Sequence, residues 1–474
     1  MVSNQWPICK PPKGGSDTLM RGASINSATI KQTTLAPEML DILQRETFDY
    51  FVHECNPANG LIRDKNQTDA PADIAAVGFA LAAYPVGVER AFITRAEAVE
   101  RTLSILRFFQ NSPQGTEPTA TGYKGFYYHF LDMTSGRRVR ECELSTVDTT
   151  FLLAGMLLAA EYFNHHSASE QEIRTLADNL YRRADWRWAQ DGGATVTHGW
   201  KPESGFLPYR WQGYDEALLL YLLGLGSPTH PLPKESYEAW SSTYRWRKVY
   251  DHEFLFAGPL FIHQLSHVWV DFRGVQDEYM RGKSIDYFEN SRRATYVQRQ
   301  YAIHNPGQFV DYGTNCWGIT ASDGPGCVTH RIKGRERRFF EYLARGVPDG
   351  PDDGTIAPWA VVASLPFAPE IVLSVLKWFD DIKLTRDSPY GFKATFNPTY
   401  PSESGQAPYW VSPWHCGLNQ GPIVLMIENF RTGLLWRLMR QCSYLVNGLR
   451  RAGFTGGWLG AQGPDSWKEN HMVE

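Results

Sequence analysis

Apolar residues recur at helical spacing through most of the chain. The pattern begins near Ala36, where Leu40, Leu43 and Phe48 share one face of a predicted helix. Further helices, separated by connections rich in Gly, Pro and Asn, are predicted at about 72–84, 92–110, 148–165, 168–183, 213–224, 255–268, 283–303, 334–346, 368–382 and 420–450. No segment shows the sustained apolar and polar alternation of a β-sandwich or the strand pattern of a TIM barrel. The sequence therefore predicts an all-α fold.

The helical pattern also bears on domain organisation. It continues without a compositional break, which predicts a single domain over residues 36–474 after an irregular segment at 1–35 that is rich in Pro, Gly and Ser. Helical hairpins closed into a ring, the (α/α)6 toroid, would produce this pattern. A solenoid of helix pairs would give the same sequence pattern, and no repeat of fixed period distinguishes the two folds.

Charge and cysteine usage narrow the class of protein. Lys and Arg total 47 against 51 Asp and Glu, and we find no run of like charges, so neither nucleic acid nor an anionic membrane is an expected partner. The longest apolar run, Phe151 to Ala160, is shorter than the roughly 20 residues of a membrane span. Seven scattered cysteines without a CxxC pair indicate neither a disulfide scaffold nor a zinc site.

The beginning of the chain carries no apolar segment of the signal-peptide type. We therefore expect a periplasmic or secreted protein if a leader has been removed, and a cytoplasmic protein otherwise. The oligomeric state is not encoded in any pattern that we find.

Aromatic residues make up 14% of the chain, more than helical packing alone requires. Rings that stack on sugar faces are one use for the excess, and a large core is the other. Long loops in a helical scaffold usually carry the functional site because ordering them costs entropy. Three such loops, at residues 185–215, 305–333 and 385–420, are rich in Trp, Tyr, Asp, His and Gly.

The segment WQGYDEALLLYLLGLG places two acids directly before an apolar helix. Trp211 and Tyr214 flank Asp215 and Glu216. Acids at a helix start are stabilised by the exposed N–H groups and the macrodipole, so simple capping explains the pattern equally well. Partial desolvation by the rings would raise the carboxyl pKa, as a general acid near neutral pH requires. Glu216 is the first catalytic candidate.

A second group of acids lies in ECELSTVD, at the start of another apolar helix. Glu141, Glu143 and Asp148 are close in sequence, and clustered carboxylates push their pKa values apart. A helix N-cap is the commoner role for an acid at the position of Asp148. Glu143 and Asp148 are the other catalytic candidates.

The Gly-rich loop DYGTNCWGITASDGPG offers rings and polar groups to a ligand. Tyr312 and Trp317 are predicted stacking platforms, while Asp323 and His330 are predicted to hydrogen-bond sugar hydroxyls. A plain turn is the alternative for Asp323, which precedes Gly-Pro-Gly.

Motifs for metals and cofactors are missing from the chain. His263 and His267 are four residues apart, but no HExxH pattern or third ligand accompanies them, so a packed or hydrogen-bonded pair is expected. No dinucleotide-binding, phosphate-loop or serine-hydrolase motif stands in its required context. The sequence therefore predicts neither a metal nor a cofactor.

Six segments together resemble one known family. They are STVDTTFLLAGMLLAA, WQGYDEALLLYLLGLGSP, LFIHQLSHVWVDFRG, NCWGITASDGPG, DDGTIAPWAVVASLPFAPE and NQGPIVLMIENFRTGLLW, in this order from about residue 40 to 460. The combination resembles the bacterial glucoamylase-like family, which includes the β-1,2-glucanases of glycoside hydrolase family 144. The resemblance implies an (α/α)6 barrel, a β-1,2-glucan or sophoro-oligosaccharide substrate, and hydrolysis by paired carboxylates without a cofactor.

The resemblance also implies roles for single residues. Glu216 matches the proton donor, and Glu143 and Asp148 match its companions in the cleft. The aromatic positions of the site fall on Trp211, Tyr214, Tyr312, Trp317 and Trp359.

One position departs from the family pattern, which has an acid ahead of Gln-Gly-Pro where this chain has Asn419. An amide contacts substrate but does not take a proton at neutral pH, so Asn419 cannot be a water-activating base. One alternative is that Asp148, Glu143 or Glu428 supplies the base. The others are a transglycosylase, an exo-acting enzyme on a related linkage, or an inactive glycan-binding relative. An epimerase is disfavoured because the loops contain more carboxylates than histidines.

Overall fold

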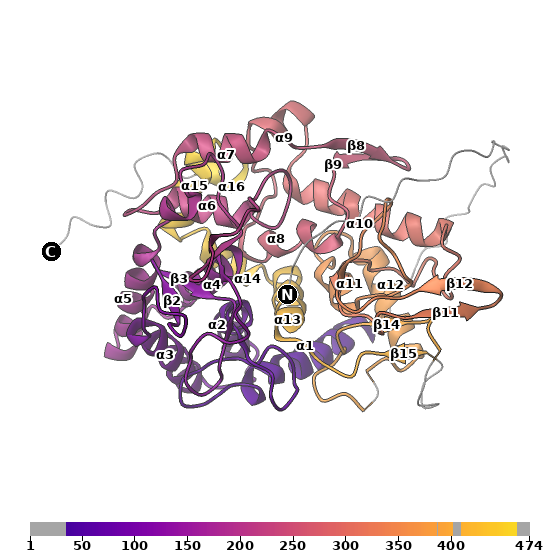
Figure 1. The fold of residues 1–474 in the computed structure, drawn as a ribbon, viewed down its shortest axis with the longest axis horizontal. Coiled ribbons are helices and arrows are strands. Elements are labelled where there is room, and N and C mark those ends of the chain that lie inside the picture. The colour runs from indigo at the N-terminus through magenta and orange to yellow at the C-terminus, as the bar shows by residue number, and fades with distance from the viewer. Residues whose placement is uncertain (1–34, 386, 402–408, 462–474) are drawn as a thin grey trace.

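Helices are the main secondary structure of the computed structural model, which describes residues 35–385, 387–401 and 409–461 (Figure 1). The α-helices are α1 (Leu35–His53), α2 (Ile74–Glu89), α3 (Arg95–Asn111), α4 (Thr146–Tyr162), α5 (Ala168–Arg183), α6 (Leu218–Gly226), α7 (Lys234–Ser241), α8 (Leu265–Trp269), α9 (Glu278–Lys283), α10 (Tyr287–His304), α11 (Pro358–Ala363), α12 (Pro369–Asp381), α13 (Gly417–Arg431), α14 (Leu434–Met439), α15 (Ser443–Arg451) and α16 (Gly457–Ala461). Two short 3-10 helices are η1 (Trp188–Gln190) and η2 (Leu260–His263). The expectation of a mainly helical fold is confirmed.

The most apolar helices lie at the centre of the fold. Nearly every residue of α2, α4 and α6 is buried, as expected for helices that are apolar on all sides. By contrast, α5 and α12 bury one face only, and their charged residues lie on the other face, except for the buried Glu170. The helix α13 packs against α1, α2 and α11, so segments from both ends of the chain meet in the core.

Two glycines allow the central helices α2 and α4 to approach closely. A Cβ atom on Gly155 would lie 2.1 Å from the carbonyl oxygen of Gly78, and one on Gly78 would lie 2.3 Å from the carbonyl oxygen of Phe151. The two backbones are therefore in direct contact, which no larger side chain would permit. This crossing fixes the relative positions of the two helices and of the residues at their N-terminal ends.

Short strands connect the helices. They are β1 (Ala72–Asp73), β2 (Gly122–Tyr123), β3 (Phe126–Tyr128), β4 (Phe130–Leu131), β5 (Leu144–Ser145), β6 (Gly199–Lys201), β7 (Gly205–Phe206), β8 (Trp246–Val249), β9 (His252–Leu255), β10 (Ala321–Ser322), β11 (Thr329–Ile332), β12 (Arg335–Arg338), β13 (Leu343–Ala344), β14 (Phe396–Asn397) and β15 (Trp410–Val411). One sheet has five strands in the order β2-β3-β5-β6-β7, and the other sheets of the described residues have two each. Strands of two to four residues are too short to show a period, so the sequence did not predict them.

The helix predicted at 334–346 is wrong, because strands β12 and β13 occupy this segment. Strand β12 forms a hairpin with β11, and both residues of its turn, Lys333 and Gly334, have positive φ angles of 49° and 80°. Two successive residues with positive φ are typical of a type I′ hairpin turn. Rings at Phe339, Phe340 and Tyr342 imitate helical spacing, which explains the error.

The same hairpin corrects the expectation that the chain has no cluster of like charges. It projects from the body of the fold and carries Arg331, Lys333, Arg335 and Arg338 as exposed residues, with Glu336 as the acid among them (Figure 1). In the sequence, Ile332, Gly334 and Glu336 interrupt the basic residues of this stretch, so they do not form a continuous charge run. The positive charge nevertheless gathers at one protrusion.

Other helices differ from prediction mainly at their boundaries. The predicted helix at 420–450 is divided into α13, α14 and α15, because Gly433 takes a positive φ of 66° between the first two. The helices α7, α9, α11 and α16 were not predicted, and the predicted irregular segment at 1–35 lies outside the described residues except for its last one. Within the described part of the chain, no helix has both the length and the apolar character that a membrane crossing demands.

Candidate active site

Acidic side chains gather where α2, α4 and α6 begin. Asp73 is the N-cap of α2, and its Oδ1 accepts hydrogen bonds from the amides of Ala75 (2.7 Å) and Ala76 (3.4 Å). Asp148 lies in the first turn of α4, and Glu216 lies two residues before α6. Helix N-termini favour negative charge, while several carboxylates in one place repel one another. These opposing effects determine which of the acids is protonated.

His129 lies at the centre of these acids because of the short strands. Tyr128 pairs with Leu144 across β3 and β5, so His129 faces Glu143 one step further along, and its amide donates to the Glu143 carbonyl (3.0 Å). The His129 Nδ1 atom is 3.1 Å from Glu143 Oε1 and 3.7 Å from Asp148 Oδ2. Burial opposes protonation of this ring, but the carboxylates of Asp148, Glu143 and Asp73 outweigh it and raise its pKa to about 10. His129 is therefore an imidazolium at neutral pH.

Glu216 has the properties of a proton donor. Burial is the largest influence on its carboxyl group, the negative charges of Asp148 and Asp215 add to it, and together they raise the pKa to about 8 against the opposing charge of His129. The Glu216 carboxyl group is thus protonated at neutral pH, as a general acid must be. By contrast, Asp215 acts locally, because its Oδ1 accepts from the Ala217 amide and from Trp240 Nε1, both at 3.0 Å.

Glu143 and Asp148 differ from Glu216 in their surroundings. Burial would raise the pKa of Glu143, but the hydrogen bond and the charge of His129 lower it below its ordinary value. Asp148 is not the N-cap that the sequence suggested as an alternative. Ser145 is the N-cap, since its Oγ accepts from the Asp148 amide (3.2 Å) and donates to Asp148 Oδ2 (2.6 Å). The two predicted catalytic companions of Glu216 therefore both lie close to His129, Glu143 through a hydrogen bond and Asp148 through an ion pair.

A further pair of charges lies beside this group. Lys65 Nζ is 2.5 Å from Asp323 Oδ2. This ion pair joins the connection before α2 to the loop after β10. The backbone of Lys65 also pairs with Cys416, directly before α13. Burial raises the pKa of the neighbouring Asp64, opposed by the charges of Lys65 and His129. The first turns of α2 and α13 and the Asp323 loop therefore meet next to the His129 group.

Comparison with known proteins identifies this arrangement. Residues 208–443 match the sequence profile of the Glycoamylase family, described as "Putative glucoamylase". A solved structure from Bacteroides uniformis with the same description is 32% identical, with a TM-score of 0.79, and the match covers 90% of this chain and 100% of the other. The chain belongs to this glucoamylase-like family. The resemblance inferred from the sequence is thereby confirmed.

Two other members of the glucoamylase-like family have more specific names. An exo β-1,2-glucooligosaccharide sophorohydrolase (non-reducing end) from Parabacteroides distasonis is 30% identical over 468 residues, and the match covers 90% of this chain and 60% of the relative's length. This chain thus spans about 60% of that relative. An endo-β-1,2-glucanase from Chitinophaga pinensis, solved with sophorotriose and glucose, is 27% identical with a TM-score of 0.77, covering 90% of this chain and 99% of the other.

The five predicted stacking rings of this family member are buried. Trp211 stacks on the His198 ring at 3.8 Å and donates from Nε1 to Thr146 Oγ1 (3.0 Å), which joins it to the start of α4. No ring of this set exposes more than 8% of its surface, and Trp317 exposes none; the set is Trp211, Tyr214, Tyr312, Trp317 and Trp359. Rings packed into the core offer no free face to a sugar, so this structure does not fit their predicted role. Their excess in the sequence reflects core packing.

Tyr214 and Tyr312 illustrate what these buried rings do instead. The Tyr214 ring packs against His263 and Tyr287. The Tyr312 hydroxyl donates to Asp352 Oδ1 (2.9 Å), a carboxylate whose pKa burial raises to about 6. Both are contacts within the core of the family fold.

The remaining predicted positions have distinct locations. His330 lies on the β11–β12 hairpin, where its Nε2 is 3.3 Å from the Tyr400 hydroxyl. Asn419 is partly exposed in the first turn of α13. Glu428, named as an alternative base, is buried and bound by Arg90 Nε (2.7 Å) and Nη2 (3.1 Å), so it is not available to activate water.

One group of the described residues could hold a metal ion: the ligand atoms of Asp73, His129 and Asp148 lie within 4.8 Å of one another. Their hydrogen bonds favour an ion network instead, because His129 already faces Glu143 and Asp73 already accepts two amides. A protonated imidazole is also not a ligand. The pair His263 and His267 is hydrogen-bonded as predicted, with His263 Nε2 3.2 Å from the Ala257 carbonyl oxygen and His267 Nε2 2.9 Å from Ser291 Oγ.

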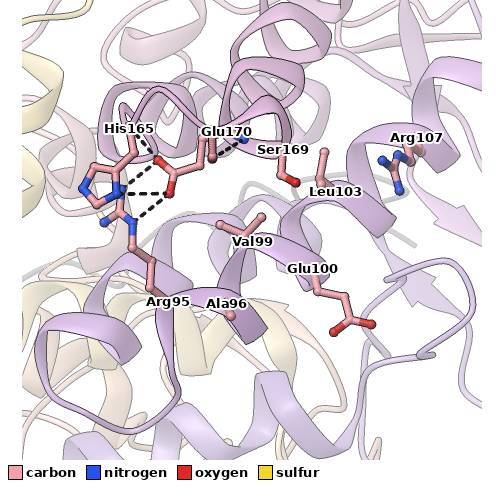
Figure 2. A pocket seen from close by; sticks show the side chains of 10 residues that line it. Arg95, Ala96, Val99, Glu100, Leu103, Arg107, His165, Ser169 and Glu170 are labelled. Atoms are coloured by element: carbon pink, nitrogen blue, oxygen red, sulfur yellow. Dashed lines mark hydrogen bonds and ion pairs between the residues drawn. The ribbon is translucent and has the colours of Figure 1, made fainter.

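A surface cavity of about 550 Å³ lies between α3 and α5, and no residue of the carboxylate group lines it (Figure 2). Figure 2 shows that Arg95 and Glu170 on its rim point toward each other, with His165 beside them. Arg95 Nε and Nη2 bind the two Glu170 oxygens at 2.8 and 2.9 Å. These charges neutralise each other, so we place the candidate site at the carboxylate group and not in this cavity.

The sequence missed several residues of the site. Asp73, His129, Asp64 and Lys65 lie in turns and two-residue strands without a recognisable motif. One signal could have found Asp73: it directly precedes the apolar helix α2, as Asp148 and Glu216 precede α4 and α6. His129 could not have been found in this way, because only strand pairing brings it to the acids.

Proposed function

We propose that this chain is a glycoside hydrolase that cleaves β-1,2-linked glucan or sophoro-oligosaccharides, with Glu216 as the general acid. The observation that carries the proposal is the buried carboxyl group of Glu216, with its pKa raised to about 8, in one group with Glu143, whose pKa is lowered by His129. Glycosidases need one protonated and one ionised carboxyl group at the same pH. The names of the family members from Parabacteroides distasonis and Chitinophaga pinensis support the substrate class.

In this mechanism Glu216 protonates the glycosidic oxygen as the bond to the leaving sugar breaks. Asp148 keeps Glu216 protonated, because its negative charge raises the pKa of Glu216. Asp148 itself is held by Ser145 and lies close to the imidazolium of His129. The proposed role of Asp148 is therefore to keep the catalytic proton on the carboxyl group of Glu216.

Glu143 is our candidate for the base that activates water. Its pKa is lowered, so it is ionised at neutral pH, and its side chain is 26% exposed against 13% for Asp148. Asn419 cannot serve because an amide does not accept a proton. We propose that Asn419, at the start of α13, contacts substrate together with Asp323 and Lys65.

We also propose that the central helices close into an (α/α)6 toroid. In the ring, α13 contacts α2, α2 contacts α4 and α4 contacts α6, while α8 and α11 both contact α13. Outer helices cover this ring, with α3 on α2, α5 on α4, α15 on α6 and α12 on α11. Parallel inner helices would place their N-terminal ends at one side, where Asp73, Asp148 and Glu216 meet.

The test is incubation with linear β-1,2-glucan beside β-1,3-, β-1,4- and α-1,4-glucans, with products followed by chromatography over time. We expect short sophoro-oligosaccharides from the β-1,2-glucan alone. Release from a different glucan would overturn the substrate class, and longer or cyclic products without new reducing ends would replace hydrolysis by transglycosylation. If no product is released from any of the four polymers or from sophoro-oligosaccharides, the proposed activity is overturned.

A further inference from the structure

Tyr342 faces Asp323 at the edge of the site. Strands β10 and β13 pair antiparallel, with Ser322 opposite Leu343. The next residues, Asp323 and Tyr342, therefore stand opposite each other one step beyond the ladder. Side chains of directly opposed residues project to the same side with Cβ atoms about 5 Å apart. The ring of Tyr342 thus shares a face with a carboxylate of the site.

A buried ion pair holds this edge in place. Arg345 Nε and Nη2 donate to the two carboxylate oxygens of Asp353 at 2.7 Å each, and neither side chain is exposed. Arg345 also donates to the carbonyl oxygens of Ser322 (2.6 Å), Phe340 (3.2 Å) and Glu341 (3.2 Å). These carbonyls belong to the residues directly before the facing pair. A bidentate, fully buried pair is a rigid support for both loops.

The exposure of Tyr342 is unusual for a ring supported in this way. It exposes 49% of its surface and is one of few large apolar or aromatic side chains among the described residues to do so. Burial of its hydroxyl, with the negative charges of Glu216, Asp323 and Asp148, raises its pKa above the ordinary value. The hydroxyl is therefore within electrostatic reach of the proposed acid while the ring faces solvent. A tyrosine ring has few rotatable bonds, so an exposed ring on a firmly held backbone loses little entropy when it binds a ligand.

We propose that Tyr342 is a substrate-contact residue: its ring forms a wall of the subsite next to Glu216, and its hydroxyl binds the sugar whose glycosidic oxygen Glu216 protonates. This inference rests on the proposed function and adds a residue to it. It also supplies the exposed aromatic surface that the five buried rings do not provide.

The experiment compares Tyr342→Ala and Tyr342→Phe with wild type on linear β-1,2-glucan and sophoro-oligosaccharides. Tyr296→Phe is the control, because Tyr296 is a partly exposed tyrosine of α10 whose hydroxyl donates to Glu370 of α12. We expect Tyr342→Ala to raise KM about tenfold through lost ring contact. Tyr342→Phe should raise it about threefold through the lost hydrogen bond. The affinity for sophoro-oligosaccharides is also measured in the inactive variant Glu216→Gln and in the double variant Glu216→Gln/Tyr342→Ala. The double variant should bind more weakly than Glu216→Gln by the same factor as the rise in KM.

A purely structural role predicts a different result. Because the ring is exposed, the urea midpoint of Tyr342→Ala should equal that of wild type, so a raised KM would not reflect unfolding. If Tyr342→Ala has the activity, the KM and the binding affinity of wild type, this inference is overturned and the proposed function still stands. Absence of turnover and of binding in wild type would overturn the proposed function together with this subsite.

Discussion

Replacing Glu216 by Gln tests the proposed acid directly. The amide has nearly the shape of the carboxyl group, so packing before α6 is retained, but it cannot deliver a proton to the glycosidic oxygen. With a pKa of about 8, nearly every Glu216 carboxyl is protonated at pH 6, so wild type works there at its full rate. General acid catalysis contributes about 100- to 10,000-fold, or roughly 3–5 kcal/mol of transition-state stabilisation. We expect kcat to fall by a factor in this range.

Reducing ends released from linear β-1,2-glucan at pH 6 measure this loss, at substrate concentrations that separate kcat from KM. Glu161→Gln is the control. Burial raises the pKa of Glu161 to about 7, but it lies at the other end of α4, roughly 20 Å along the helix from Asp148 at 1.5 Å per residue. We expect Glu161→Gln to keep wild-type activity. Activity of Glu216→Gln within threefold of wild type would refute the assignment of Glu216.

Three further predictions follow from the same contacts. Activity should fall as pH rises through about 8, because Glu216 must keep its proton, and Asp148→Asn should move this fall to lower pH by removing a charge that raises the Glu216 pKa; pH profiles of kcat measure both. Arg345→Met should lower the free energy of unfolding in urea by about 3–5 kcal/mol, because Asp353 is left buried and unpaired. A chelator should leave activity unchanged, because His129 faces Glu143 and Asp148 as an ion partner and not as a metal ligand.

Each of these has an outcome that contradicts it. A fall in activity that does not move in Asp148→Asn would mean that another group titrates. Arg247→Met, at the partly exposed pair with Asp349, controls for Arg345→Met and should cost less than about 1 kcal/mol. Equal losses in the two Arg variants would contradict the argument from burial. Loss of activity with chelator, restored by a divalent cation, would turn the His129 group into a metal site.

The main helices were predictable because their signals are local. The apolar runs of α2, α4 and α6 and the amphipathic faces of α5 and α12 lie within single windows of sequence. The hairpin at Lys333 and Gly334 was missed because rings after it repeat at helical spacing, whereas the turn depends on two residues of positive φ. The contact of α2 with α4 was also out of reach, since nothing in the sequence shows that Gly78 and Gly155 face each other.

The residues of the candidate site also differ in whether a local sequence signal or a contact between distant segments identifies them. Glu216, Glu143 and Asp148 were found because acids before apolar helices are visible in the sequence. His129 joins them through strand pairs of two or three residues, and Tyr342 joins through the β10–β13 ladder, which the buried pair of Arg345 and Asp353 holds. The aromatic positions failed for the opposite reason. Composition counts rings but does not tell a buried ring from an exposed one, so Trp317 was given the role that the structure favours for Tyr342.

The pKa values of the site show why its chemistry needed three dimensions. Glu143 and Glu216 are the same residue type, yet one is made more acidic and the other less. The difference comes from His129, which donates to Glu143 and whose charge is shared with Asp148, while burial dominates at Glu216. Two carboxyl groups whose pKa values are pushed apart can act as acid and base at one pH. His129 therefore determines which carboxyl group acts as the base and which as the acid. Exchanging His129 for a neutral residue would raise the pKa of Glu143 and so weaken the proposed base, while Glu216 would keep its proton.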